Sequence, residues 1–492
     1  MRRAAVTGVV GAVVLAAVTL VGWIGWLWYD SRLPDTYSVM DHGGLDYGGG
    51  RVPSSGHHAG GPGISVTDLR GPQAESPDAT FTLTAQTATM RLASGRTVDA
   101  LTFGGRSPGP ELRVRQGDLV QVTLVNEDVV QGVTIHWHGV DVPNAEDGVA
   151  GVTQDAVLPG ERYVYRFRAE QVGTFWYHSH QVSSEEVRRG LFGAFVIEPA
   201  EPRHEELDLA LAVHTYEGVP TLNANDGVAE RDAAPGTRVR LRLINSDNVP
   251  HGMALAGTRF RVIALDGTDL NEPSPMEDAL LEVAGGGRAD IAFTVPERPV
   301  RLSLVDTDVA LAFNADGRAS PLAERPDAEF DPATYGLPAA TPFNTSSRFD
   351  RSFELSIGRW PGFLDGRPGL QWTINGGIFP HVPTFVVEEG DLVHVTITND
   401  TNAVHPMHLH GHHVLVLSRD GRPVSGSPWW ADTLNVEGGE RYEVAFRANN
   451  PGIWMDHCHN LRHAADGLTM HVFYAGVTTP FTIGGAPSNE PE

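Results

Sequence analysis

Two strand signatures occur in the same order three times along the chain and restrict the folds open to it. The first is a turn followed by alternating apolar and polar residues that ends at an asparagine, at residues 116–126, 235–245 and 389–399. The second is a Gly-x-Arg triplet before another apolar segment, at residues 160–167, 286–293 and 439–446. Alternation at a period of two is typical of half-buried strands. We therefore predict three copies of one β domain.

The length of 492 residues and the hydrophobic content of 41% suit about three domains of ordinary size. Short strands separated by Gly and Pro turns predict an all-β fold of three consecutive β-sandwich domains, over residues 76–200, 201–340 and 345–480. Residues 31–75 are rich in Gly and are expected to form a flexible tether. Residues 481–492 are expected to form a disordered tail.

The N-terminal segment has the length and composition of a membrane span. Residues 4–29 carry no charge, follow Arg2 and Arg3, and end in several aromatic residues. As a helix they would extend about 39 Å at 1.5 Å per residue, enough to cross a hydrocarbon layer of ~30 Å. We predict that residues 1–30 are a single-pass anchor with the domains on the extracytoplasmic side. The alternative is a cleaved signal peptide and a secreted protein, but the apolar part of such peptides normally has about 7–15 residues.

Charge and cysteine content exclude several classes of function. There are 61 acidic and 36 basic residues, and the net charge of −25 argues against nucleic acid as a partner. All the basic residues are Arg, which excludes lysine Schiff-base and P-loop chemistry. The single cysteine, Cys458, excludes an internal disulfide framework and a multi-cysteine zinc site. The 21 histidines are the feature left to explain.

The histidines concentrate in four motifs of the first and third copies. The first copy holds His-Trp-His at 136–138 and His-Ser-His at 178–180, and the third holds His-Pro-Met-His-Leu-His at 405–410 and His-Cys-His at 457–459, followed by His463. On a strand, residues two apart project to the same face, where both can bind metals. A thiolate with two imidazoles is the blue-copper arrangement. A zinc hydrolase commonly uses about three protein ligands, fewer than the eleven candidates here.

The four motifs, read in order as H-W-H-G, H-S-H, H-P-x-H-L-H-G and H-C-H-x3-H, resemble those of three-domain multicopper oxidases of the laccase type. The resemblance covers most of residues 76–480. It implies cupredoxin-like Greek-key domains, a copper-free second domain, a type 1 copper in the third, and a type 2 copper with a type 3 pair between the first and third. The implied type 1 ligands are His405, Cys458 and His463, and the implied type 2 ligands are His136 and His408. The implied type 3 ligands are His138, His178, His180, His410, His457 and His459.

The resemblance also implies a reaction. A phenolic or aromatic amine substrate would lose one electron at a time, and O2 would take four electrons to become water. Cys458 is bonded through the backbone to His457 and His459, so electrons would have a covalent path between the two centres. These three residues are therefore expected to be catalytic.

Two further residues take positions that matter in the family. Asp147 stands where relatives keep a proton-relay or water-orienting carboxylate, with an ordinary Asp-Gly turn as the alternative. Leu468 stands at the axial position of the type 1 site, with Met470 as the alternative. Leu cannot coordinate, and loss of a soft axial donor should raise the potential of that copper.

Other interpretations of the sequence have less support. Oxidation of cuprous or ferrous ion is the second candidate, but dedicated cuprous oxidases often carry a Met-rich segment, and the eight Met here form no cluster. A non-catalytic copper scaffold or reservoir could lose ligands without losing its fold, whereas all eleven positions are filled. The expected partners are O2, a small-molecule or metal-ion reductant, and the membrane.

Overall fold

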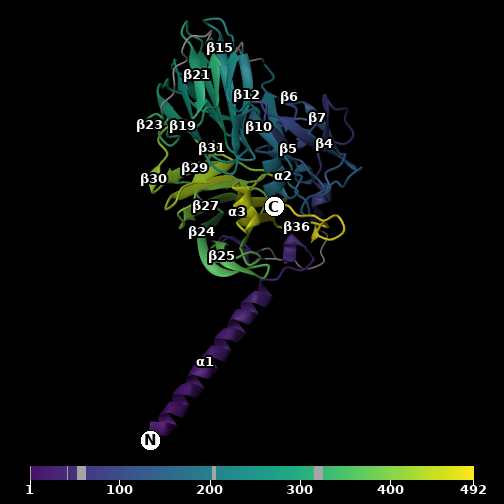
Figure 1. The fold of residues 1–492 in the computed structure, drawn as a ribbon, viewed down its shortest axis with the longest axis vertical. Helices are drawn as coiled ribbons and strands as arrows, with labels where there is room; N and C mark the ends of the chain where they lie inside the picture. The colour runs from purple at the N-terminus through teal and green to yellow at the C-terminus, as the bar shows by residue number, and fades with distance from the viewer. Residues whose placement is uncertain (1, 42, 53–62, 202–206, 315–324) are drawn as a thin grey trace.

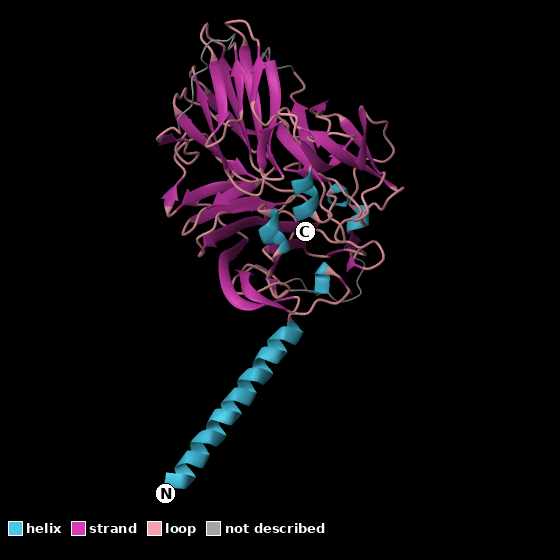
Figure 2. Cartoon of the chain, in the orientation of Figure 1, coloured by secondary structure: helices cyan, strands magenta, loops and turns pink. Residues whose placement is uncertain are grey.

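The computed structural model describes residues 2–41, 43–52, 63–201, 207–314 and 325–492. Strands dominate the body, as Figure 2 shows, and one long helix projects from it. In the described residues the larger sheets form three pairs (Figure 1), and two further sheets have two strands each. The prediction of an all-β fold with three sandwiches is confirmed.

The first sandwich combines two four-stranded sheets around an apolar core that includes the buried Trp137. One sheet has the order β5 (Thr97–Phe103), β4 (Ala79–Arg91), β7 (Leu119–Asn126) and β9 (Arg162–Arg168). The other has the order β6 (Leu112–Arg115), β11 (Phe192–Glu198), β10 (Gly173–His178) and β8 (His136–His138). Both histidine motifs of this copy therefore lie on or at the end of the second sheet.

The second sandwich has two six-stranded sheets and its own apolar core. One sheet runs β13 (Val219–Leu222), β12 (Leu207–Tyr216), β15 (Arg238–Asn245), β20 (Arg288–Thr294), β17 (Arg261–Leu265) and β18 (Thr268–Asp269). The other runs β14 (Val228–Arg231), β22 (Ala310–Phe313), β21 (Val300–Leu304), β16 (His251–Ala256), β19 (Ala279–Val283) and β23 (Ala328–Glu329).

The third sandwich contains the sheet that carries the remaining histidine motifs. That sheet has the order β2 (Leu45–Asp46), β26 (Thr384–Val387), β35 (Thr469–Tyr474), β34 (Ile453–Cys458), β28 (His405–Leu409) and β32 (Thr433–Val436). Its partner sheet has the order β25 (Arg367–Ile374), β24 (Arg351–Leu364), β27 (Leu392–Asn399), β33 (Arg441–Arg447), β29 (Val414–Arg419) and β30 (Arg422–Pro423), with β31 (Trp430–Ala431) beside β29. The short helix α2 (Ser183–Arg189) follows the second motif, and the short helix α3 (Leu461–Ala465) carries His463, the last residue of the fourth.

The repeated signatures occupy equivalent places in the three sandwiches. The first signature forms β7, β15 and β27, and the second forms β9, β20 and β33, which pair antiparallel with them. The terminal asparagine makes equivalent bonds in each copy, because its amide nitrogen donates to two backbone carbonyls of neighbouring segments. The pairs of acceptors are Val129 and Val157 for Asn126, Val249 and Val283 for Asn245, and Ala403 and Val436 for Asn399.

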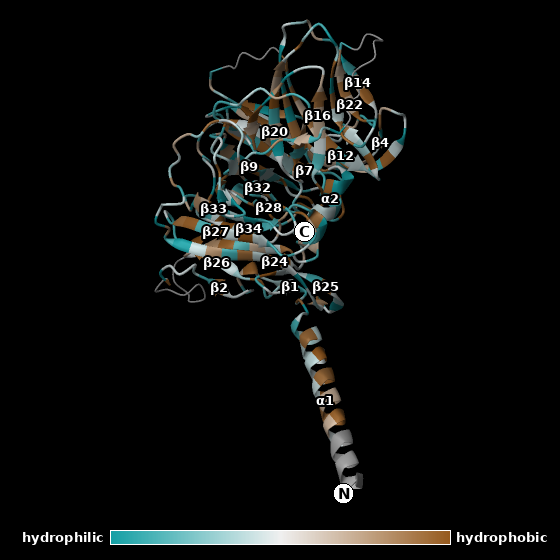
Figure 3. Ribbon diagram, turned by 90° about the vertical axis from the view of Figure 1, so that its left-hand side faces the viewer, coloured by the Kyte–Doolittle hydropathy of each residue, from teal (hydrophilic) through white to brown (hydrophobic). Residues whose placement is uncertain are grey.

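The apolar N-terminal segment forms α1 (Arg2–Asp30), which leaves the body near the β24–β25 hairpin (Figures 1 and 3). Its part from Gly11 to Asp30 is long and apolar enough to cross a membrane and is not buried by the rest of the chain. A membrane anchor and a signal sequence share these properties.

Two expectations about flexible segments are wrong for the residues that the structure describes; residues 42 and 53–62 of the supposed tether lie outside the described ranges. Residues of the supposed tether form β1 (Thr36–Tyr37), β2 and β3 (Ile64–Ser65), which pair with strands of the third sandwich or of the C-terminal region. The supposed disordered tail contains β37 (Ile483–Gly484), the partner of β1, and the buried Asn489. Backbone hydrogen bonds to neighbouring strands order these Gly-rich segments without a large apolar core of their own.

Candidate metal centres

Cys458, His405 and His463 form a compact triangle of ligand atoms. The Cys458 Sγ lies 3.6 Å from the His405 Nδ1 and 3.8 Å from the His463 Nδ1, and the two nitrogens are 3.3 Å apart. The centre of such a triangle is about 2.1 Å from each corner, close to the length of a metal–imidazole bond. The His405 Nε2 lies 3.0 Å from the Thr401 hydroxyl, which leaves its Nδ1 directed at the sulfur. These residues fit a copper ion held by one sulfur and two nitrogens.

Strand alternation separates this triangle from a second group of histidines. Met407 of β28 lies opposite Cys458 of β34, and His408 lies opposite His457. Opposed residues share a face of the sheet, and successive residues alternate. Cys458 is therefore on the face of His405 and Met407, while His457 is on the opposite face with His408. The backbone of β34 lies between two potential metal centres.

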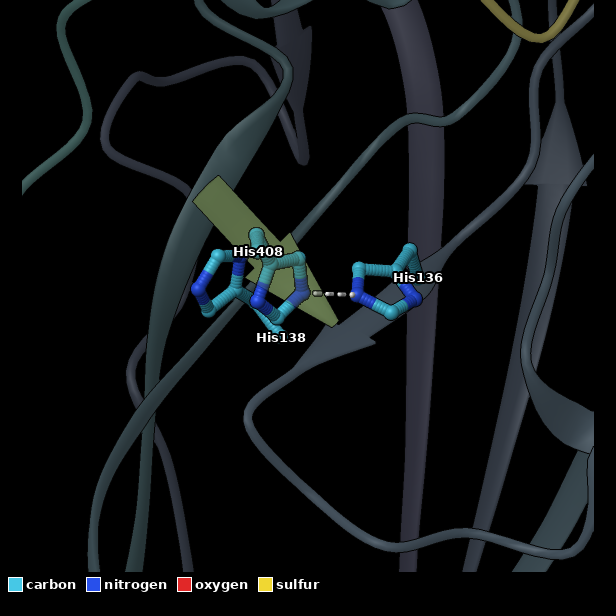
Figure 4. Close-up of side chains that lie close together, drawn as sticks. All are labelled: His136, His138 and His408. Carbon is cyan, nitrogen blue, oxygen red and sulfur yellow. Dashed lines mark hydrogen bonds between the residues drawn. The ribbon is translucent and has the colours of Figure 1, made fainter. Parts of the chain in front are cut away.

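The second group consists of eight buried imidazoles from both outer sandwiches. Two sets of three could each hold one ion, with all ligand atoms within 4.8 Å of one another: His138, His178 and His459, and His180, His410 and His457. The other two imidazoles face each other, with 3.4 Å between the Nε2 atoms of His136 and His408 (Figure 4). His138, which also lies close to them in Figure 4, stacks on His408 with a centroid separation of 3.7 Å.

Several imidazoles have one nitrogen hydrogen-bonded to the protein, and several have a buried nitrogen without a hydrogen-bond partner. The Nδ1 atoms of His178, His180 and His408 donate to the carbonyls of Ser179, Pro491 and Asp432 at 2.9 Å. Within the described ranges, the Nε2 atoms of His178 and His180, the Nδ1 atom of His138 and both nitrogens of His459 are buried without a hydrogen-bond partner. Unpaired buried nitrogens are costly unless an ion binds them, so these imidazoles fit metal ligands.

Asp147 lies directly behind two of the imidazoles. Its carboxylate is 3.1 Å from the His136 Nδ1 and 3.1 Å from the His410 Nδ1. Gly148 has a φ of +77°, and a Cβ there would lie 1.8 Å from the Ile135 carbonyl, so glycine is required for this close turn. Asp147 therefore belongs to an Asp-Gly turn, the alternative expected from the sequence, and also contacts both histidines.

Burial keeps eight of the candidate histidine ligands neutral. It lowers the pKa of His405 to about 3 and that of His463 to about 4, with further contributions from neighbouring charges. It also lowers the pKa values of His138, His178, His180, His408, His410 and His459 well below 6.5, helped by their proximity to other histidines. Neutral imidazole is the form that binds metal. Burial raises the pKa of the Cys458 thiol, so metal binding must displace its proton.

These shifts predict acid sensitivity of the copper-free protein. The unfolded chain takes up protons on these eight histidines near pH 6.5, whereas the folded chain does not until lower pH, so their contribution to the free energy of unfolding should fall as the pH drops below about 6.5. Each such imidazole contributes up to about 1.4 kcal/mol per pH unit. At about 2 kcal/mol each between pH 7 and pH 5, the eight imidazoles named above would together cost up to about 15 kcal/mol, so we expect the free energy of unfolding to fall by at least roughly 5 kcal/mol, measured by denaturant unfolding. A free energy independent of pH over this range would contradict the burial of neutral imidazoles.

The second sandwich also reaches the histidine group, which the sequence did not predict. Gly286 of its Gly-Gly-Arg triplet has a φ of +82°, and a Cβ there would lie 2.6 Å from the His459 ring. The Arg288 guanidinium makes two 2.6 Å bonds to the Asp432 carboxylate and donates to the Thr174 carbonyl at 3.0 Å. Arg288 therefore joins all three sandwiches. A sequence feature that could have indicated this contact is Gly287, because the other two copies have Glu at the equivalent position.

Asp432 connects this arginine to the imidazoles. Its carboxylate lies 3.2 Å from the His138 Nε2, and its carbonyl accepts from His408. Burial alone would raise the pKa of the carboxyl, but Arg288 and the bond to His138 hold it well below its usual range. Asp432 is thus an ionised, buried group that orients two histidines.

Two more contacts escaped sequence prediction. Trp372 of β25 packs against both His405 and His463, with centroid separations of 4.8 and 4.5 Å. The Glu492 carboxylate lies 3.0 Å from the His457 Nδ1 and accepts from the Ser183 hydroxyl at 2.9 Å. Trp372 and Glu492 lie outside the histidine motifs, so the spacing of those motifs could not predict either contact.

Leu468 and Met470 are both fully buried in the apolar cluster that contains Cys458. The backbone N–H of Cys458 donates to the Leu468 carbonyl at 3.1 Å, while Met470 lies opposite Asp456. Leu468 is therefore the direct neighbour of Cys458 across the strand pair.

The comparisons with known proteins agree on one family. Models described as multicopper oxidase match residues 84–202 and 359–476. The crystal structure of a multicopper oxidase from Pseudomonas thermotolerans is 30% identical and superposes with a TM-score of 0.66, covering 81% of this chain and all of that one. The chain belongs to the multicopper oxidase family. It is therefore a copper-dependent oxidoreductase of cupredoxin-like sandwiches that uses O2 and a reductant, and its histidine groups fit the four coppers of the family.

Other multicopper oxidases extend the comparison. Multicopper oxidase MmcO of Mycobacterium tuberculosis is 27% identical over 457 residues, which cover 80% of this chain and 87% of that protein. Laccase-1 of Botryotinia fuckeliana is 25% identical over 480 residues, covering 83% and 84%. The laccase structure from Botrytis aclada shares the fold, with a TM-score of 0.68, 22% identity and coverage of 82% and 89%. The laccase-like class expected from the sequence is confirmed.

Proposed function

We propose that this oxidase acts as a laccase on phenols and aromatic amines and reduces O2 to water. When bound, copper supplies the redox chemistry, taking electrons singly from the substrate and delivering four to O2. The observation that carries the proposal is the complete set of eleven ligand residues, buried or half-buried and grouped as four such ions require. Relatives named laccase support the substrate class.

The ligands are assigned as follows in this proposal. His405, Cys458 and His463 would hold the type 1 copper, and Leu468, at the position where relatives keep an axial residue, would not coordinate it. His136 and His408 hold the type 2 copper. The type 3 pair takes the two sets of three: His138, His178 and His459 for one ion, and His180, His410 and His457 for the other.

The catalytic role of Cys458, His457 and His459 is to conduct electrons. The thiolate faces the type 1 site, and the adjacent imidazoles extend from the same short backbone segment toward the other side. These residues would therefore give electrons a covalent path across the sheet. Asp147 holds the protonated nitrogens of His136 and His410 and is the carboxylate placed to deliver protons for water formation.

Replacing Asp147 by asparagine should slow turnover about 100-fold without changing reduction of the type 1 site, because the electron path is intact while a proton-transferring carboxylate is lost. Steady-state O2 uptake and anaerobic stopped-flow bleaching of the blue colour measure the two steps. The control is Glu146→Gln, since Glu146 is an adjacent buried carboxylate that accepts from the Arg166 backbone instead. Equal turnover of Asp147→Asn and wild type at full copper content would refute the role.

The proposed domains are residues 76–200, 201–340 and 345–480, with the second free of copper.

We also propose that α1 is an uncleaved single-pass anchor, which places the oxidase domains on the extracytoplasmic face of the cell membrane. The length and hydropathy of Gly11–Asp30 and the contacts of Asp30 and Arg32 with the body support this arrangement.

Oxygen uptake by the copper-loaded protein tests the function. A phenol, an aromatic amine, ferrous ion and cuprous ion are compared as donors. The proposal expects sustained uptake with the two organic donors. Uptake with only the metal ions would establish the alternative, a metal-ion oxidase, and uptake with none would contradict both.

A further inference from the structure

The β24–β25 hairpin covers the histidines of the sulfur-containing site. Trp372 packs against both rings, and the Arg359 guanidinium lies 4.3 Å from the centre of the Trp372 ring. Arg359 and Trp372 are also directly paired across the two strands. His463 is only partly buried. An electron donor that approaches these histidines on this side must approach along the hairpin.

The turn of the same hairpin is bound to the end of α1. The backbone N–H of Gly366 donates to the Ser31 hydroxyl at 3.1 Å, and the N–H of Leu33 donates to the Asp365 carboxylate at 3.3 Å. Arg32 adds an ion pair with Asp365 at 3.5 Å. Figure 3 shows the apolar helix leaving the body beside β25. A membrane crossed by α1 therefore has its surface at this hairpin.

The hairpin exposes apolar side chains on both of its faces. Trp360 is 62% exposed and pairs with Gln371, whereas Leu370 is 52% exposed and pairs with the neighbouring Pro361. Adjacent pairs point to opposite faces, so the two side chains cannot both be covered by one flat protein surface. Immersion in the lipid interface would cover both.

The charges and aromatics nearby agree with a lipid surface. Arg359 and Arg367 are exposed on the hairpin, against a net charge of −25 for the chain, and anionic headgroups attract such arginines. Trp23, Trp26 and Trp28 are exposed near the end of α1, where interfacial aromatics are typical.

We propose that the hairpin 358–372 rests in the membrane interface and admits a hydroquinone dissolved in the bilayer as the reductant. Leu370 lies two residues from Trp372, about 7 Å along the strand, so a headgroup at the lipid surface is close to the ring that covers the site. This inference rests on the proposed anchor and laccase activity. It adds that the physiological substrate carries an apolar tail.

Oxidation of the hydroquinone balances with O2 as the oxidant. Each hydroquinone loses two electrons and two protons and becomes a quinone. Two hydroquinones provide the four electrons that reduce one O2, and their four protons equal those in the two waters formed. The electrons leave one at a time by way of the Trp372 side, and the quinone returns to the bilayer.

The test uses full-length, copper-loaded protein in vesicles of anionic and zwitterionic lipid. Oxygen uptake is measured with a water-soluble hydroquinone and with a hydroquinone that carries a long isoprenoid tail. The double variant Trp360→Gln, Leu370→Gln is expected to lose at least tenfold with the tailed donor and to keep the rate with the soluble one. The control Val228→Gln, Val249→Gln changes exposed apolar residues of the second sandwich, whose β14 lies far from α1 (Figure 3), and should affect neither rate.

Failure of the inference differs from failure of the laccase function. No uptake with the soluble hydroquinone at full copper content refutes the function itself. Uptake with the soluble donor, but equal effects of the hairpin and control variants on the tailed donor, overturns the inference.

A second measurement is independent of activity. A fluorophore attached at Leu370→Cys should be quenched by nitroxide-labelled lipid, whereas one at Val228→Cys should not, and Cys458 is too buried to compete for the label. Absence of quenching at position 370 likewise overturns the inference.

Discussion

Replacement of Cys458 by serine is expected to remove the blue colour and one of the four copper ions, and to lower O2-coupled turnover at least about 1,000-fold. Cys458 is the only cysteine in the sequence, and its sulfur lies within 3.8 Å of the ligand nitrogens of His405 and His463. Serine is nearly isosteric but is a poor ligand for this site. The other imidazoles lie on the opposite face of β34, so three ions should stay bound.

Copper analysis, visible spectra and O2 uptake measure these effects. Met455→Leu is the matched control, because it removes another buried sulfur from the same strand and should keep the colour and all four ions. A blue Cys458→Ser protein would contradict the assignment of the thiolate. Loss of all four ions would show that the two centres do not bind copper independently.

Replacement of Arg288 by methionine is expected to destabilise the protein by about 3–5 kcal/mol and to lower the copper content of the histidine group. Methionine fills much of the space but leaves the Asp432 carboxylate charged, buried and without its two 2.6 Å bonds. The carboxylate also orients His138, and its backbone orients His408, so their positions should loosen. Denaturant unfolding and copper analysis are the measurements.

The control for Arg288 is the equivalent arginine of the third copy. Arg441 follows the same Gly-x signature but is exposed, and its guanidinium pairs with Glu443 at 3.4 Å. Arg441→Met should cost less than about 1 kcal/mol. Equal, small effects of the two substitutions would contradict a structural role for Arg288 at the centre.

The sequence predicted the elements whose signals are local and periodic. Alternation ending at Asn126, Asn245 and Asn399 identified three equivalent strands, because a strand with one buried face needs that pattern whatever its surroundings. The histidine motifs likewise predicted which side chains come together, since ligand spacing on strands follows from the backbone. All eleven candidate ligands belong to the groups that the structure forms.

The contacts between distant segments could not be predicted in this way. Arg288, Asp432 and Trp372 have no spacing that relates them to a histidine, and they meet the centres only through the packing of three sandwiches. The prediction that two segments are flexible was wrong for another reason. Composition measures the capacity to form an apolar core, whereas β1 and β37 are ordered by backbone bonds to each other, and Asn489 by side-chain bonds to Asp155 and Ala156.

The copper content and colour of the purified, copper-reconstituted protein test the central claim most directly. Two metal centres on opposite faces of β34, joined through Cys458, require four ions per chain and a blue resting state. Four ions in a blue protein are the predicted result. A colourless oxidised protein, or one that binds clearly fewer than four ions, would contradict the account.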